Sequence, residues 1–254
     1  MESVAVRRLR NIHWLLAVQS LVVILVSINR LSSLTLTYVT ANEFLRWVDL
    51  LNMLVLPIMS LVAFYLLKKV IEQPSAQVNQ RAHIALNLMF IVGVYVLGAS
   101  YGDHEVTNYL HSRFCIVEDA ADGSATGFAD MDSDLCRIVI FNDDEFSHWL
   151  FFTGFVMVNG ALLLLQAVFP HGALLSQRDI ALLIVNGLFI GAGIFANLAF
   201  EVIGLDLVVI VLLAVMSVLL LWRRGREPLF VYYAMSYVFG LVATAIVKLL
   251  VGTT

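Results

Sequence analysis

The sequence has few charged residues. Asp, Glu, Lys and Arg make up 13% of its 254 residues, against about 25% in soluble domains. Hydrophobic residues make up 61%, and the mean hydropathy is +0.90. This composition excludes a soluble globular fold, and the net charge of −4 argues against nucleic acid as a partner. It predicts an integral membrane protein whose main partner is the lipid bilayer.

Several sequence signatures are also absent. No Ala-x-Ala-like cleavage site follows the first apolar stretch, so we expect a retained helix rather than a cleaved signal peptide. No internal or inverted repeat is present, which weakens a transporter interpretation. His-x-x-His boxes, typical of membrane desaturases, are missing, and residues 230–250 lack the histidines of the seven-span zinc hydrolases. The sequence therefore indicates no known family.

Seven apolar stretches are long enough, or nearly so, to cross a bilayer, which takes roughly 17–25 residues. We place them near Ile12–Ile28, Leu50–Leu67, Ile84–Ala99, Trp149–Phe169, Ile180–Phe200, Leu205–Trp222 and Phe230–Leu250. The sequence thus predicts an all-α fold, with residues 1–254 forming one domain of seven transmembrane helices. We expect the third helix to continue through Tyr101 and beyond.

The basic residues predict an orientation, because cytoplasmic connections are enriched in Lys and Arg. With the N-terminus inside, ten of the fifteen basic residues are cytoplasmic: Arg7, Arg8, Arg10, Lys68, Lys69, Arg81, Arg178, Arg223, Arg224 and Arg226. We therefore predict N-inside and C-outside, in the cell (inner) membrane.

The two cysteines both fall in the long segment between the third and fourth apolar stretches, at about 101–144. On the predicted topology this segment is outside, where disulfides persist. A bridge between Cys115 and Cys136 would close a loop of about twenty residues and stabilise the fold by about 3 kcal/mol. Since residues 117–134 are rich in Asp, Glu, Gly and Ser, we predict a stapled acidic outer loop.

Histidines and carboxylates gather on both flanks of this loop. One group is Asp103, His104, Glu105 and His111, and the other is Asp143, Asp144, Glu145 and His148. Imidazole and carboxylate are ligands for transition metals and also groups that transfer protons. Ionisable groups at a membrane boundary are functional candidates, because placing them there is costly.

Helical spacing aligns the first group. If the third helix continues to His111, then His104, Asn108 and His111 lie at i, i+4 and i+7, on one face. The Cys115–Cys136 bridge would bring this face to the fourth helix.

In the second group, Glu145 and His148 form a Glu-x-x-His pair, a spacing that directs both side chains at one ion in helical bundles. Asp144 and His148 are also one turn apart. We interpret Asp143 mainly as a capping residue, because Asn142-Asp143-Asp144 suits an N-cap and first helical turn.

These residues predict a membrane-embedded metal-dependent enzyme with its site at the outer membrane boundary. The metal would be zinc or iron. The predicted ligands are His104, His111, His148 and Asp144, and the predicted bases are Glu105 and Glu145. A metal-activated water would hydrolyse a lipid or small molecule, whereas iron would allow oxidation.

These residues could also be no more than solvated helix ends. Two functional alternatives remain open as well. A proton-coupled transporter would use the histidines with Glu201 and Asp206. A non-catalytic membrane protein would bind a partner through the stapled loop. The other histidines, His13, His83 and His171, are dispersed on the opposite side, and we expect interfacial hydrogen bonding there.

The predicted topology can be tested with fused reporters. A reporter placed after Thr254 should be exported, and one placed in the connection containing Arg223 should stay cytoplasmic, because that connection is basic. A cytoplasmic C-terminus would show that the spans are miscounted.

Overall fold

The computed structural model describes residues 4–72, 79–115, 133–200 and 204–251. These residues form nine α-helices: α1 (Val4–Leu31), α2 (Trp47–Leu50), α3 (Leu56–Ile71), α4 (Gln80–Leu110), α5 (Asp134–Phe141), α6 (Ser147–Val168), α7 (Gln177–Phe200), α8 (Leu205–Arg224) and α9 (Pro228–Val251). Three short π-helical segments are η1 (Leu51–Val55), η2 (His111–Cys115) and η3 (Asn142–Phe146). The prediction of an all-α fold is confirmed for the described residues.

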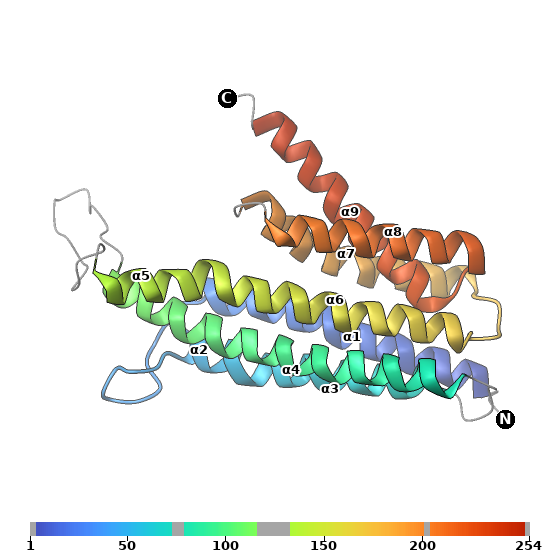
Figure 1. Ribbon diagram of the computed structural model, residues 1–254, viewed down its shortest axis with the longest axis horizontal. Helices are drawn as coiled ribbons and strands as arrows, with labels where there is room; N and C mark the ends of the chain where they lie inside the picture. Colours follow the sequence, from blue (N-terminus) through green and yellow to red (C-terminus); the bar gives the residue numbers. More distant parts are fainter. Residues whose placement is uncertain (1–3, 73–78, 116–132, 201–203, 252–254) are drawn as a thin grey trace.

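The segment η1 joins α2 to α3, η2 extends α4, and η3 joins α5 to α6. The described residues therefore contain seven long helices, each apolar and long enough to cross a membrane by length and composition. The helix bundle has two ends (Figure 1). We call the end with Cys115 and Cys136 the cysteine end, and the opposite end, where α1 begins, the amino-terminal end.

The third and fourth long helices extend much further than their apolar stretches. They run over Gln80–Cys115 and Asp134–Val168, so the predicted continuation of the third helix is confirmed. The segment expected as a loop at 101–144 is helical on both sides, and its acidic middle lies outside the described residues. The fourth long helix starts early because Ser133 is its N-cap, where Oγ accepts a hydrogen bond from Cys136 N at 3.3 Å.

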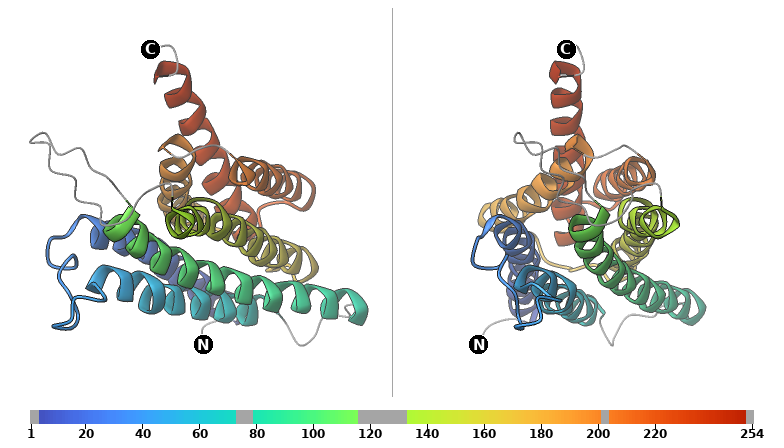
Figure 2. Two further views of the ribbon diagram at one scale, coloured as in Figure 1. Left: turned by 60° about the vertical axis from the view of Figure 1, so that its left-hand side comes forward. Right: turned by 90° about the vertical axis from the view of Figure 1, so that its left-hand side faces the viewer.

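Helices α4 and α6 lie side by side along much of the bundle, and α1 packs against α3 (Figure 1). Helix α7 packs against α9, whose C-terminal half leans away from the other helices (Figure 2).

Glycines allow the backbones of α4 and α6 to approach closely. A Cβ atom at Gly154 would lie 2.5 Å from the backbone nitrogen of Leu97, and one at Gly93 would lie 2.8 Å from Cβ of Met157. Small residues at such contacts are the usual basis of close helix packing in membranes. These two glycines therefore set the spacing between the two helices that carry the histidine and carboxylate groups.

A second glycine contact joins α7 to α9. A Cβ atom at Gly187 would lie 2.9 Å from the carbonyl oxygen of Tyr232, and one at Gly191 would lie 2.8 Å from that of Ser236. The Gly187 and Gly191 pair thus supports close helix approach, as small residues four positions apart commonly do.

Replacing Gly154 tests the close approach of α4 and α6. Gly154→Ala should destabilise the protein by about 1–3 kcal/mol, because the added methyl group meets backbone atoms that cannot move aside. Gly102→Ala is the matched control on α4, since a Cβ there meets nothing within 4 Å. It should be neutral or stabilising. Thermal unfolding in detergent measures both, and equal melting temperatures would contradict the packing argument.

Candidate functional site

Asp143 is the centre of the histidine and carboxylate cluster at the cysteine end. It lies in η3, is only 2% exposed and faces α4. Its Oδ2 is 2.8 Å from His111 Nδ1, and Asn108 Nδ2 donates to the same oxygen at 3.5 Å. Its Oδ1 is 3.1 Å from His104 Nδ1, without the alignment of a hydrogen bond. The prediction that His104, Asn108 and His111 share one helical face is therefore confirmed.

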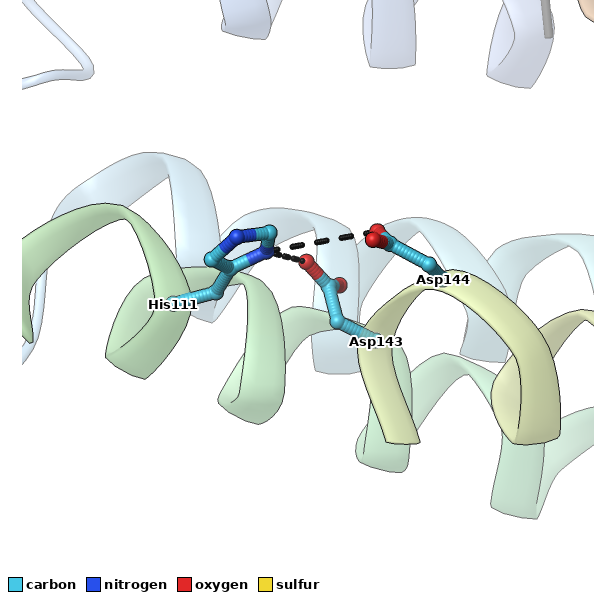
Figure 3. A group of neighbouring side chains, drawn as sticks. All are labelled: His111, Asp143 and Asp144. Atoms are coloured by element: carbon cyan, nitrogen blue, oxygen red, sulfur yellow. Dashed lines mark hydrogen bonds and ion pairs between the residues drawn. The ribbon is translucent and has the colours of Figure 1, made fainter. Parts of the chain in front are cut away.

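Asp144 approaches the same histidine from the solvent side. Its Oδ1 lies 4.0 Å from His111 Nδ1, and its side chain is 58% exposed. Figure 3 shows the two neighbouring carboxylates of η3 directed at the His111 ring, which comes from the adjacent helix. One ligand atom from each of His111, Asp143 and Asp144 lies within 4.8 Å of the others. This donor set suits a divalent transition-metal ion.

All three residues of this group lie in π-helical segments. In a regular α-helix, neighbouring residues point about 100° apart, because one turn takes 3.6 residues. Asp143 and Asp144 lie within η3, and His111 is the first residue of η2. π-helical turns inside longer helices occur frequently at functional sites. Here, such turns carry the two consecutive carboxylates and the imidazole that they approach.

The disulfide clips the two halves of the site together. Cys115 and Cys136 are bonded with a Cα–Cα distance of 5.5 Å, and both are buried. They pack with Val139 in a small apolar cluster one turn or so beyond His111. The predicted disulfide is present, and it joins the end of η2 to α5.

His104 and His148 lie beside the cluster, outside its group of ligand atoms. Their ring centroids are 5.4 Å apart. His104 Nε2 is 3.1 Å from Nη2 of Arg30, which comes from α1. A guanidinium at that distance would repel a cation from this nitrogen, since both carry positive charge. His104 therefore suits a role in holding Asp143 better than a role as a ligand.

The two predicted bases lie in different places. Glu105 is 4% exposed, and its Oε1 accepts a hydrogen bond from Arg30 Nη2 at 3.0 Å. It lines a largely apolar cavity of about 160 Å³ with Asp49 and Tyr109. Glu145 follows Asp144 in η3 and is exposed. Only Glu145 is a direct chain neighbour of the ligand group.

Of the two acidic residues of the transporter alternative, Asp206 is not part of this cluster. Asp206 lies in the first turn of α8, where its Oδ1 accepts hydrogen bonds from the backbone nitrogens of Gly204 and Leu207 at 2.7 and 2.8 Å. Its carboxylate therefore satisfies backbone donors at the start of this helix. Glu201 lies outside the described residues.

The capping interpretation of Asp143 is wrong. The fourth long helix begins at Asp134, so Asp143 lies in its interior, where a buried carboxylate needs a partner. The sequence feature that could have indicated this earlier helix start is Ser133, because serine is favoured at N-caps. Arg30 was missed as well, because nothing in its local sequence links the end of α1 to α4.

No protein-family model, curated protein or solved structure matches this chain. Its function must therefore be argued from the site itself.

The contacts of Asp143 predict its importance for stability. Asp143→Asn should destabilise the protein by roughly 1–3 kcal/mol, because an NH2 donor would replace one of the two carboxylate oxygens that face His104 and His111. Asp144→Asn, at a largely exposed position, should change stability by less than about 0.5 kcal/mol. Chemical or thermal unfolding of the two variants measures this difference, and similar losses in both would refute the central position of Asp143.

Proposed function

We propose that this protein is a membrane-embedded metal-dependent enzyme whose metal is held by His111, Asp143 and Asp144. The observation that supports it is the convergence of one imidazole and two carboxylates within 4.8 Å, from two helices clipped by a disulfide. The proposed metal is zinc or iron, because both accept imidazole nitrogen together with carboxylate oxygen. On binding, the metal would displace the proton that His111 Nδ1 shares with Asp143.

The neighbours of Asp143 would support such a site. Asn108 donates to a carboxylate oxygen, and His104 lies 3.1 Å from the other oxygen. Groups of this kind fix the orientation of a ligand and tune the metal. The proposed site thus combines a set of ligands with surrounding groups that would orient these ligands.

The proposed chemistry is hydrolysis of a lipid or small molecule, in which the metal would lower the pKa of a bound water. Glu145 is the better candidate base, since Glu105 is engaged by Arg30 and faces the apolar cavity. If the metal is iron, the proposed enzyme is an oxidoreductase instead of a hydrolase.

The proposed location is the outer boundary of the cell (inner) membrane, with the N-terminus inside and the C-terminus outside. The apolar helices are consistent with a lipid bilayer environment, and the count of basic residues supports the orientation. A site at a membrane boundary is accessible to lipid-like substrates. We therefore propose a lipid before a small molecule as the substrate.

A second candidate is proton-coupled transport. It is supported by the arrangement of two imidazoles around one carboxylate, His104 and His111 with Asp143. His148 extends this arrangement through its ring contact with His104. Histidine can bind and release protons near neutral pH, so the same residues could relay protons without a metal.

Elemental analysis of detergent-purified protein tests the metal proposal. We expect about one equivalent of zinc or iron, since a single ligand group is present in the described residues. His111→Ala and Asp143→Ala should each weaken binding at least tenfold, because each removes a direct ligand. His83→Ala is the matched control at the amino-terminal end, where His83 contacts Glu72, and it should retain the metal.

Metal-free protein that gains no thermal stability from added zinc or ferrous iron would overturn the proposal. Proton flux that disappears in Asp143→Asn, in the same metal-free protein, would instead favour the transport candidate.

A further inference from the structure

A second polar cluster lies at the amino-terminal end, on the opposite side of the bundle from the proposed metal site. His171, in the connection from α6 to α7, is only 4% exposed. Neither of its ring nitrogens has a hydrogen-bond partner among the described residues. The same holds for Gln166 Oε1 and His13 Nδ1, which are also buried. Four buried polar atoms of three neighbouring side chains thus lack a protein partner.

Direct contacts place Glu227 in this cluster. Glu227 precedes α9, and its Oε2 accepts hydrogen bonds from the backbone nitrogen of His171 at 2.7 Å and from Gln166 Nε2 at 3.3 Å. The carboxylate therefore lies against the connection that carries the His171 ring.

A basic group beside the cluster, the guanidinium of Arg8, already has hydrogen-bond partners. The Arg8 guanidinium, from α1, donates to the carbonyl oxygens of Val70, Ile71, Phe169 and Pro170, at the ends of α3 and α6. His13 Nε2 lies 3.1 Å from Oδ1 of Asp179, at the start of α7. Besides Glu227, the charged or titratable groups that act on His171 are Arg8, His13 and Asp179. None of them satisfies its ring nitrogens.

Buried polar atoms without partners are rare in native proteins, and each costs roughly 1–3 kcal/mol. Internal water is the usual remedy, since one buried water makes about three hydrogen bonds to such groups. One or two waters would satisfy the ring nitrogens of His171 and the side-chain oxygen Oε1 of Gln166. A metal is a poorer fit, because no group of three ligand residues forms here in the described structure.

We propose that internal water fills this cluster and joins His171, Gln166 and Glu227 into a buried proton-binding site. This site is separate from the proposed metal centre and goes beyond the proposed enzyme function. Water would bridge the imidazole and the carboxyl group, so that one proton can move between them.

The electrostatic environment brings the two groups closer in proton affinity. Burial raises the pKa of Glu227, against the opposing effects of the His171 N–H and Arg8. Burial, together with the positive charge of Arg8, lowers the pKa of His171. An ordinary glutamate and histidine differ by about two pKa units, and both shifts narrow that difference.

Infrared difference spectroscopy of the purified full-length protein during a pH titration tests this site. Protonated carboxyl groups give their own C=O stretching band. We expect a band whose titration midpoint lies above that of an ordinary glutamate and which is lost in Glu227→Gln. The glutamine keeps the shape and an acceptor oxygen for the His171 N–H.

Glu72→Gln provides the matched control at the same end. Burial raises the pKa of Glu72, but hydrogen bonds from Lys68 and His83 outweigh it, so that the pKa is lowered overall. The band should therefore survive in Glu72→Gln. A Glu227 carboxyl that titrates at or below the ordinary range would overturn the proposal.

Two further measurements test the water and do not depend on Glu227→Gln folding. In D₂O the carboxyl band should shift promptly, because water reaches the proton. In His171→Phe, which removes two water partners and dries the site, the band should change frequency and titrate at higher pH. A band unchanged by both treatments would also overturn the proposal. Metal content should stay the same in all these variants, which separates this result from the test of the metal site.

Discussion

The close approach of α4 and α6 is the constraint on which the cysteine end depends. Gly93 and Gly154 leave room for one backbone against the other, and only at this separation can a short aspartate side chain reach two histidines of the opposite helix. The disulfide and the apolar contacts of Val139 hold together η2 and α5, which extend the same two long helices. Packing in the middle of the bundle therefore controls the geometry of a polar site at its boundary.

Both ends of the bundle combine histidine with carboxylate, but they do so differently. At the cysteine end, the imidazoles of His104 and His111 face a buried carboxylate directly. At the amino-terminal end, the ring nitrogens of His171 face no protein partner, and Glu227 contacts a backbone nitrogen instead. The first arrangement is the one proposed to hold a metal ion, whereas the second leaves buried polar atoms that internal water is proposed to satisfy.

Arginine helps to define each end. Arg8 ties the ends of α3 and α6 together through backbone carbonyl groups, and Arg30 joins Glu105 to His104. Guanidinium groups are suited to this role, since they carry several donors in a fixed plane. Arg30 therefore links two residues with different surroundings, because Glu105 lines the apolar cavity and His104 lies beside Asp143, although the two are adjacent in sequence.

The seven long apolar helices and the shared face of His104, Asn108 and His111 could be predicted from the sequence, because apolar length and helical period are local properties. The disulfide could be predicted because both cysteines fall in one segment between two apolar stretches. The central position of Asp143 and the separate surroundings of Glu105 could not be predicted in this way. Those roles depend on where the fourth helix begins and on how closely it meets α4. Such contacts join residues more than thirty positions apart, so no local pattern encodes them.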